Sequence, residues 1–220
     1  GLGIVELSTH FQNLKPDIVL TVADRFETIA TAVAASYMNI PVAHTQGGEM
    51  TGSIDENVRH AITKLSHIHF PSTKKAKKNL ILMGENPSKV FLTGCPSIDL
   101  IKNTNLSMNK NILTNKQGVG DKIDLTKEYI ILLQHPVTTE FGDGLNQIKQ
   151  TLEAIGKLKD NVQVIGVWPN PDAGSDDISK GIRIIREQKK NLKMRFFRNF
   201  TPEDFLRILN NSSCVVGNSS

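Results

Sequence analysis

The chain has 220 residues, of which 39% are apolar and 22% are charged, and its formal net charge is +4. This composition is ordinary for a soluble globular protein, and no run of about 18 apolar residues predicts a membrane span. The small charge excess and the aromatic content of 5% argue against a nucleic-acid partner, because platforms for base stacking are scarce. The chain does not open with an export signal, so we expect a cytoplasmic protein.

The first half of the chain alternates short apolar runs with amphipathic segments. Residues 1–14 carry apolar side chains near helical spacing, and a Val/Ile/Leu run at 17–22 predicts a buried strand. The same rhythm predicts helices at 26–38, 54–66 and 72–84 and strands at 41–43, 68–70 and 90–93. Short strands without polar alternation, separated by helices, predict a parallel sheet covered on both faces.

The second half repeats this rhythm after an interruption. Residues 104–127 are rich in Asn, Lys and Gly, and we expect them to connect a domain at 1–103 to a domain at 128–220. The second domain is predicted to contain strands at 129–133, 162–167, 194–197 and 214–216 and helices at 144–159, 175–188 and after residue 201. Thr201 and Pro202 are typical of a helix start, with a hydroxyl N-cap and proline at the first position. Because the chain opens inside a helix and stops at a strand-to-loop corner, we expect native sequence to continue on both sides.

Two cysteines and two histidines are interpreted as structural residues. Cys95 and Cys214 lie far apart without a Cys-x-x-Cys pattern, so we predict neither a disulfide nor a zinc site and expect both to be small buried side chains. His67 and His69 alternate along a predicted strand with no third donor nearby, and a metal site needs more than two donors.

Four polar clusters directly follow predicted strands, where ligands collect in open parallel sheets. They are Asp24 with Arg25, residues 44–49, residues 134–136 and residues 217–220. Asp24 has two interpretations, as a cap of the following helix or as a catalytic carboxylate aimed into a cleft beside Arg25. Glu49 follows Gly47 and Gly48, which permit a tight turn and a close approach of the backbone to a ligand.

Three further groups also have more than one interpretation. Asp55 and Glu56 open a predicted helix, where acids complement the helix dipole, and Glu56 is one turn from Arg59 and His60. His135 comes between a strand and a proline and can meet phosphate or protons near neutral pH. The terminal Gly-Asn-Ser-Ser offers amides and hydroxyls to phosphate oxygens. Each of these signals is weak when taken alone.

The order of the clusters and the residues that surround them are more specific than any single cluster. The blocks V-A-D-R-F-E, A-H-T-Q-G-G-E, G-S-I-D-E-N-V-R-H, L-T-G-C-P-S-I-D, L-L-Q-H-P-V-T-T-E, P-N-P-D-A-G-S and V-V-G-N-S-S follow one another from residue 22 to residue 220. In this order they resemble the hydrolysing UDP-N-acetylglucosamine 2-epimerases. The non-hydrolysing epimerases have different sequence motifs, with G-D-T in place of Ala23-Asp24-Arg25. One departure from the pattern is Ala23, where most relatives carry glycine.

The resemblance implies a fold and a reaction. The fold is α/β, with two Rossmann-like doubly wound domains facing a cleft, which is the GT-B arrangement, and the nucleotide is held mainly by the C-terminal domain. In the implied reaction, UDP leaves the anomeric carbon of UDP-N-acetylglucosamine as a proton is removed from the adjacent carbon. Water then adds to the resulting glycal and a proton returns on the opposite face, giving N-acetylmannosamine and UDP. Two carboxylates in different environments suit these proton transfers.

The same resemblance implies residue roles and partners. Asp24 and Glu49 are expected to form the acid/base pair, with Asp55, Glu56 and His135 completing the catalytic group. The substrate-binding residues are expected to be Arg25, His44, Gly48, Arg59, Ser219 and Ser220. No metal or other cofactor is expected, because the reaction involves no net redox change and the chain has no G-x-G-x-x-G turn. The expected partners are the UDP-sugar, UDP and further copies of the chain.

Three alternative functions stay open. The nearest is the same reaction on UDP-N,N'-diacetylbacillosamine, because relatives for both sugars share these blocks. A GT-B glycosyltransferase rests on analogy of fold alone. A non-catalytic nucleotide-sugar-binding module would keep the acids without turnover.

Overall fold

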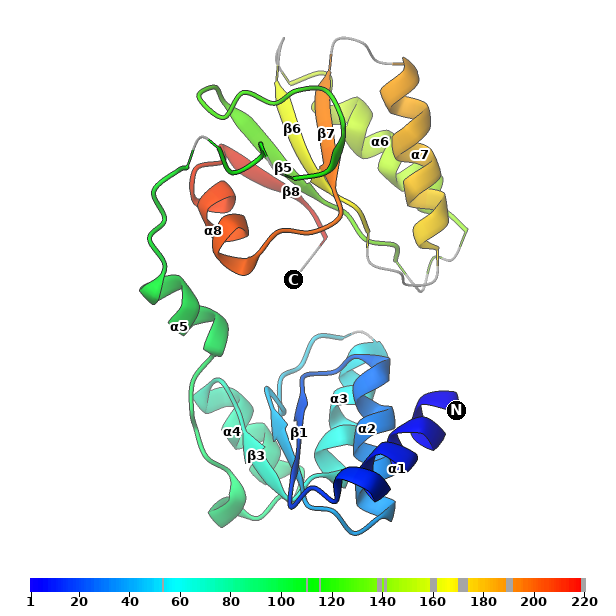
Figure 1. Cartoon of the computed structure of the whole chain (residues 1–220), viewed down its shortest axis with the longest axis vertical. Coiled ribbons are helices and arrows are strands. Elements are labelled where there is room, and N and C mark those ends of the chain that lie inside the picture. Colours follow the sequence, from blue (N-terminus) through cyan, green and yellow to red (C-terminus); the bar gives the residue numbers. More distant parts are fainter. Residues whose placement is uncertain are drawn as a thin grey trace. The chain divides into compact units, whose positions relative to one another are not determined.

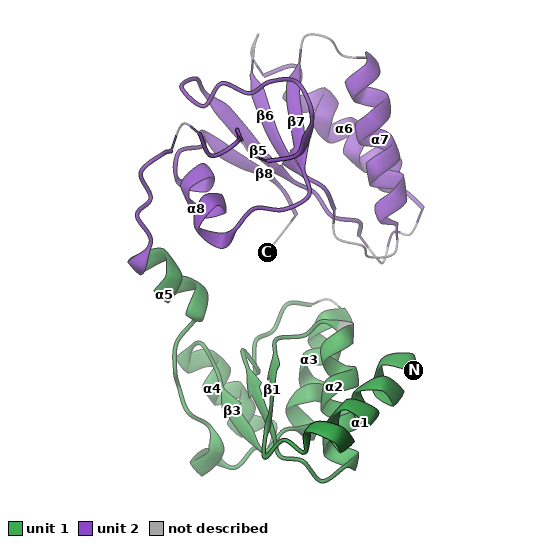
Figure 2. Cartoon of the chain, in the orientation of Figure 1, with its two compact units in different colours: residues 1–102 green, residues 103–220 purple. Residues whose placement is uncertain are grey.

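The computed structural model describes residues 1–52, 54–109, 111–114, 116–137, 140, 142–158, 162–169, 174–188 and 192–218. The chain divides into two compact units, Gly1–Lys102 and Asn103–Ser220, which Figure 2 shows in different colours. Within the described residues, no helix is both long and apolar enough to cross a membrane.

The first unit is built on a parallel sheet with the strand order β1-β2-β3. Its elements are α1 (Leu2–Leu14), β1 (Val19–Val22), α2 (Phe26–Tyr37), β2 (Val42–Thr45), α3 (Ile54–Leu65), β3 (Ile68–Phe70), α4 (Lys74–Leu82), the 3-10 helix η1 (Pro87–Lys89) and α5 (Pro96–Asn103). Figure 1 shows α1, α2 and α3 on one side of this sheet and α4 on the other. These elements confirm the predicted helices and the first three predicted strands, with ends shifted by a few residues.

Small side chains allow the helices of the first unit to pack closely on the sheet. Ala32, Ala34 and Ala35 of α2 are buried, and they share a core cluster with Val42 of β2 and Ile62 of α3. Close packing of this kind brings the polar residues at the ends of β1 and β2 within reach of side chains from α3.

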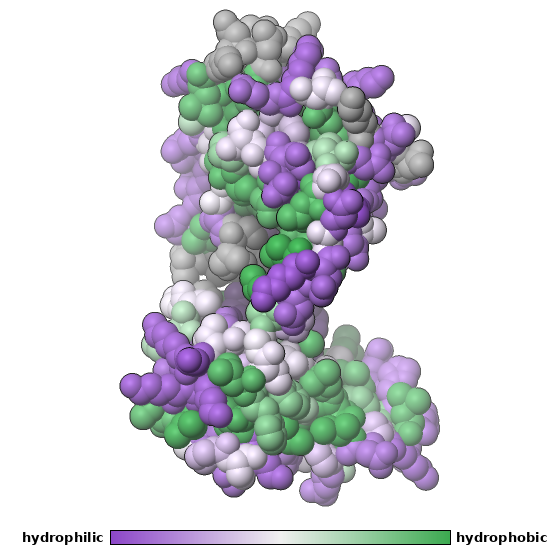
Figure 3. Space-filling model, turned by 90° about the vertical axis from the view of Figure 1, so that its left-hand side faces the viewer, coloured by the Kyte–Doolittle hydropathy of each residue, from purple (hydrophilic) through white to green (hydrophobic). Residues whose placement is uncertain are grey.

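The strand predicted at 90–93 is wrong. Val90 makes only an isolated parallel bridge to His69, beside the three-residue strand β3. Phe91 and Leu92 are 48% and 43% exposed, so this apolar run lacks the burial of a strand inside a covered sheet. Figure 3, which looks onto the side that carries α4 and α5, shows apolar surface on the first unit.

The second unit contains a five-stranded sheet in the order β4-β7-β6-β5-β8, in which β4 is antiparallel to β7 and the other pairs are parallel. Its elements are β4 (Gly118–Gly120), β5 (Tyr129–Leu133), α6 (Gly144–Ile155), β6 (Gln163–Val167), α7 (Ser175–Gln188), β7 (Lys193–Phe197), α8 (Pro202–Asn210) and β8 (Cys214–Gly217). Figure 1 shows α6 and α7 on one side of this sheet and α8 on the other. Two core clusters, one on each face, give the doubly wound arrangement that the sequence predicts.

Residues 104–127, which we expected to connect two domains, count in the second unit. Ile112 and Ile123 from this segment are buried in the core cluster around α8. The side chain of Gln163, which is 3% exposed, accepts a hydrogen bond from Asp124 N at 2.7 Å and donates one to Asp124 O at 2.9 Å. These contacts attach the segment to the sheet.

Two further expectations are settled by this fold. The helix start at Thr201 is confirmed, because Thr201 Oγ1 accepts a hydrogen bond from Asp204 N at 3.3 Å. The burial expected for both cysteines is wrong, since Cys95 is half-buried and Cys214 is exposed. Cys214 lies on β8, an edge strand of its sheet, and side chains there lack a neighbouring strand on one side.

Candidate functional site

The carboxyl ends of β1 and β2 place Asp24 and Glu49 on adjacent loops of the first unit. Arg59 from α3 contacts both loops. Its Nη2 donates to the Asp24 carboxylate, and its Nη1 donates to the Glu49 carbonyl oxygen at 2.8 Å. The Arg59 side chain is 7% exposed and that of Asp24 is 20% exposed, so this ion pair is largely shielded from water. One guanidinium group therefore links the two segments for which catalytic acids are predicted.

Glu49 lines a cavity of about 290 Å³ between its own loop and the start of α4. Thr73, Lys75 and Asn79 lie on the opposite wall, and Asp24 is not among the described residues that line this cavity. The structure thus joins the two loops through Arg59, and the Glu49 loop borders a separate recess.

His44, which we expected to bind substrate, is fully buried on β2. Its Nε2 lies 2.7 Å from the carbonyl oxygen of Ala23, and its Nδ1 lies 3.3 Å from the hydroxyl of Thr63. Burial lowers the pKa of His44 to about 4, so the ring is neutral at neutral pH. A neutral ring that donates from Nε2 accepts at Nδ1, and the Thr63 hydroxyl can supply that hydrogen. The His44 ring therefore binds the backbone carbonyl of Ala23 inside the first unit.

Gly48, another expected substrate contact, packs against α4. Its φ is +83°, and a Cβ added there would lie 2.3 Å from the Ala76 carbonyl oxygen. Asn79 Nδ2 donates to the Gly48 carbonyl oxygen at 2.8 Å. Glycine is therefore required by a close approach to the helix, and the same residue forms part of the recess that Glu49 lines.

Asp55 and Glu56 occupy different surroundings at the start of α3. Asp55 is exposed, whereas Glu56 Oε2 accepts hydrogen bonds from the backbone N–H groups of Thr51 at 2.5 Å and Gly52 at 2.6 Å. These two bonds, with Gly52 contributing most, hold the pKa of Glu56 below its usual range. Glu56 Oε1 also lies 3.7 Å from His60 Nε2. The carboxylate of Glu56 thus fastens the loop that precedes α3.

Arg25 pairs with Glu27 at the start of α2. Its Nε donates to Glu27 Oε2 at 3.3 Å, and the Arg25 side chain is 42% exposed. The Arg25 side chain is therefore accessible from solvent at the same end of the sheet.

In the second unit, the carboxyl ends of β5 and β8 bring two predicted clusters together. The Asn218 side chain accepts from His135 N at 2.8 Å and donates to His135 O at 3.0 Å. A Cβ on Gly217 would lie 1.8 Å from the Leu133 carbonyl oxygen, so only glycine fits where β8 meets β5. Ser219 and Ser220, which we expected to bind the diphosphate, lie outside the described residues. Beside this corner is a cavity of about 390 Å³ whose lining includes Gln134 and Asn218.

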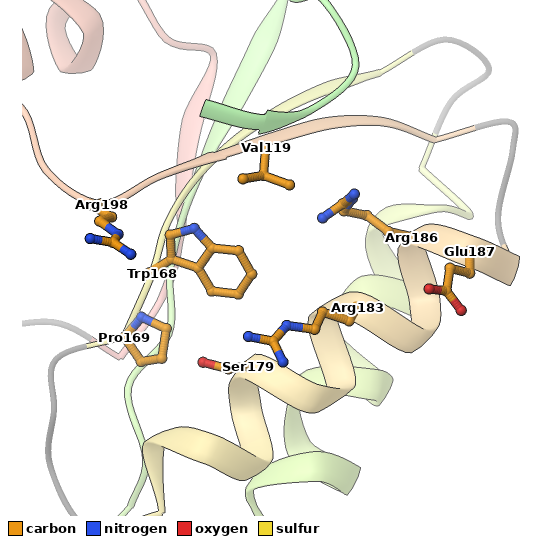
Figure 4. A pocket seen from close by; sticks show the side chains of 8 residues that line it. All are labelled: Val119, Trp168, Pro169, Ser179, Arg183, Arg186, Glu187 and Arg198. Carbon is orange, nitrogen blue, oxygen red and sulfur yellow. The ribbon is translucent and has the colours of Figure 1, made fainter. Parts of the chain in front are cut away.

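A larger cavity of about 860 Å³ lies in the second unit and was missed by sequence reasoning. Figure 4 shows Arg183 and Arg186 on α7, Arg198 beyond β7, and the Trp168 ring between them. Among the described residues, none of these three guanidinium groups has an ion-pair partner. The lining also includes one acid, Glu187, and the remaining excess of positive charge favours an anionic ligand. The spacing of Arg183 and Arg186 on one helix was a signal in the sequence, but Arg198 joins them only in the folded unit.

The described residues contain no group of three His, Cys, Asp or Glu side chains arranged to hold a metal ion. The polar groups that the fold assembles are instead an acid-guanidinium-imidazole network in the first unit and an amide corner with an arginine-lined cavity in the second.

Comparisons with a family profile and with known sequences point to the same family. Residues 1–220 match the sequence profile of the family described as UDP-N-acetylglucosamine 2-epimerase. The chain is 36% identical over 219 residues to the UDP-N,N'-diacetylbacillosamine 2-epimerase (hydrolyzing) of Legionella pneumophila and 31% identical over 221 residues to the UDP-N-acetylglucosamine 2-epimerase of Neisseria meningitidis serogroup B. Each match covers 100% of this chain and 55% of the relative. The chain therefore spans about half the length of the curated relatives it matches.

Solved structures share the fold at low sequence identity. The UDP-GlcNAc 2-epimerase from Neisseria meningitidis bound to UDP-GlcNAc has a TM-score of 0.76 and 21% identity, covering 99% of this chain and 58% of that one. The Methanocaldococcus jannaschii UDP-GlcNAc 2-epimerase in complex with UDP-GlcNAc and UDP also has a TM-score of 0.76 and 21% identity, covering 99% and 59%. These likenesses confirm the predicted α/β fold class of GT-B type.

Proposed function

Because the chain belongs to the UDP-N-acetylglucosamine 2-epimerase family, we propose that the whole protein hydrolyses UDP-N-acetylglucosamine to N-acetylmannosamine and UDP. The observation that carries this proposal is the Arg59 guanidinium, which holds the Asp24 carboxylate and the Glu49 loop at neighbouring strand ends. Two acids in unlike surroundings, one paired with a buried cation and one on a loop that lines a recess, suit the removal and the return of a proton.

The proposed chemistry has two halves. In the first, one carboxylate removes the proton on C2 of the sugar, the C1–O bond breaks, and UDP leaves with the bonding electrons, giving a 2-acetamidoglycal. In the second, the oxygen of water bonds to C1 and a proton is delivered to C2 from the opposite face. The sum is one UDP-sugar and one water converted to one free sugar and UDP. We assign Asp24 and Glu49 to the two faces, because positioned carboxylates are effective general acids and bases.

The second unit is proposed to receive the nucleotide. The Asn218 side chain holds the backbone of His135 at the end of β8. We assign the phosphate contacts to the hydroxyls of Ser219 and Ser220, which follow Asn218 in the sequence. A second cavity of the same unit carries three arginines, Arg183 and Arg186 on α7 and Arg198 after the end of β7. Such charge raises the local concentration of an anionic substrate.

A second substrate has support from particular relatives. The chain is 36% and 33% identical to hydrolysing 2-epimerases whose names specify N,N'-diacetylbacillosamine, against 31% for the Neisseria meningitidis enzyme. The same proposed steps apply to that sugar, since they involve only C1 and C2.

The test is turnover by the whole protein in heavy water with each UDP-sugar, followed by mass spectrometry. We expect stoichiometric release of UDP and a free sugar that carries one deuterium at C2. A UDP-linked product without free UDP would identify a non-hydrolysing epimerase. Turnover that requires a sugar acceptor would identify a glycosyltransferase, and tight binding without turnover would identify a binding module. The better of the two UDP-sugars identifies the substrate.

A further inference from the structure

The residue before Asp24 has an uncommon backbone conformation. Ala23 has φ +54°, in the left-handed region that side chains with a Cβ disfavour. Its N–H donates to the Thr45 carbonyl oxygen at 3.2 Å, and its own carbonyl oxygen accepts from His44. Both backbone groups of Ala23 are therefore bound by residues of β2, and this turn sets the direction in which Asp24 leaves the sheet.

The bond from His44 is itself fixed by α3. Thr63 contacts His44 Nδ1, and Arg59, one turn earlier on α3, pairs with the Asp24 carboxylate. Thr63 and His44 are fully buried, and water does not compete for their hydrogen bonds. The helix thus restrains Asp24 twice, once at its carboxylate and once through the backbone that precedes it.

We propose that His44 is a positioning residue for Asp24, holding Ala23 in the left-handed turn that presents the Asp24 carboxylate for reaction. The proposal rests on the catalytic role proposed for Asp24. It assigns His44 no contact with the sugar, because the ring has no exposed surface. It also accounts for the alanine at position 23, since a bond to the carbonyl oxygen stabilises a turn that glycine would adopt freely.

The charged and titratable groups around His44 come from three directions. His69 is its register partner on β3 and pairs with Glu85 at 3.1 Å, Arg59 faces it from α3, and Asp24 follows β1. Burial is the main cause that lowers the pKa of His44, and His69 and Arg59 lower it further, whereas the hydrogen bond to Ala23 and the charge of Asp24 raise it by less. The ring therefore keeps its Nε2 donor and its Nδ1 acceptor across the neutral range.

The test is a double-mutant cycle in the whole protein. His44→Leu removes the hydrogen-bond donor, and His44→Gln places an amide donor near the position of Nε2. Each variant is made alone and in combination with Ala23→Gly. We expect His44→Leu to lower kcat by about 10-fold or more with KM changed less than about 2-fold, because small displacements of a reacting group slow chemistry. Ala23→Gly should restore most of the lost kcat in the leucine variant, and His44→Gln should lose less than His44→Leu.

Hydrogen exchange of the peptide that contains the Ala23 amide gives a readout that needs no turnover. We expect faster exchange at this amide in His44→Leu, and His67→Leu is the matched control, since His67 accepts from Val42 N at the other end of the sheet. Thr63→Val provides a second route to the same effect if His44→Leu does not fold. The proposal is overturned if kcat or the exchange at Ala23 is unchanged in His44→Leu. It is also overturned if His44→Leu lowers kcat equally with and without Ala23→Gly. If the wild-type protein shows no turnover, the proposed function fails, and the exchange measurement still decides the role of His44.

Discussion

The two units place polar groups at the carboxyl ends of their strands in different ways. In the first unit, the buried side chains of Arg59 and His44 bind Asp24 and its preceding residue. In the second, Asn218 binds only backbone groups of His135, and three arginines line a cavity without ion-pair partners among the described residues. The first arrangement fixes the Asp24 carboxylate in place, whereas the second leaves charged groups exposed in a cavity. This difference is the reason that we propose chemistry in the first unit and nucleotide binding in the second.

The largest expected effect concerns the two acids of the first unit. Asp24→Asn and Glu49→Gln in the whole protein should each lower kcat by at least about 100-fold, because each removes a general acid or base while keeping the shape of the side chain. Steady-state release of UDP measures this loss. Asp17→Asn is the matched control, since Asp17 is exposed ahead of β1, and Asp55→Asn tests the third acid that the resemblance implies.

Two results of this experiment would contradict the contrast that we draw between the units. Wild-type rates in both amide variants would remove the chemistry from the first unit. A loss in Asp55→Asn as large as that in Asp24→Asn would show that exposed acids at this end of the sheet act on the substrate as well.

The next effect is a loss of stability in acid that originates in His44. Its pKa is about 4 in the fold against an ordinary value of 6.5, so the unfolded chain binds the proton first as the pH falls. The resulting stability is present above pH 6.5 and is lost as the pH falls toward 4, by on the order of 2 kcal/mol between about pH 7 and about pH 4.5. Urea unfolding of the wild type and of His44→Gln at the two pH values measures the difference.

This measurement sharpens the contrast between the units. The second unit contains a single histidine, His135, which is not buried, so its unfolding should lack the component that the burial of His44 produces. An equal decline of stability in the wild type and in His44→Gln would contradict the assignment to His44.

A smaller effect is expected from the amide corner. Asn218→Ala removes two hydrogen bonds to His135 near the surface and should destabilise the second unit by about 1 kcal/mol. Urea unfolding measures this change, with Asn211→Ala on the same unit as a control that also loses side-chain hydrogen bonds. If the corner receives the diphosphate, KM should rise in Asn218→Ala and stay unchanged in Asn211→Ala.

The smallest effect is expected from the arginine-lined cavity. Arg183→Gln combined with Arg198→Gln should lower kcat/KM by about 3-fold at low salt and leave kcat unchanged, because these charges attract the substrate without touching the reacting atoms. Repeating the assay in about 0.5 M salt should abolish the difference, since exposed charges are then screened. A fall in kcat that persists in high salt would place these arginines closer to the chemistry than we propose.

The sequence predicts this fold well where apolar periodicity is strong. α7 has the predicted bounds, because Ile178, Ile182 and Ile185 recur on one helical face and are all buried. The run at 90–93 looks similar to the other strands, but two of its apolar residues face solvent, and no local pattern reveals which apolar runs find a neighbouring strand.

The site was predictable in position and less so in detail. Clusters after parallel strands share one edge of a sheet, so the neighbourhood of Asp24 and Glu49 follows from topology. The double contact of Arg59 and the burial of His44 depend on how α3 packs against β2, which residue spacing does not specify. The same limit hid the arginine-lined cavity, whose members come from α7 and from the end of β7.

The loop between β2 and α3 is tethered along its length. Gly48 O is bound by Asn79, Glu49 O by Arg59, and the N–H groups of Thr51 and Gly52 by Glu56. Fixing the backbone of one residue costs about 1–2 kcal/mol in conformational entropy. In this loop that entropy is lost when the chain folds and not when a ligand binds. For the sugar that we propose to meet Glu49, the loop is preorganised, so more of the intrinsic binding free energy remains to favour the transition state.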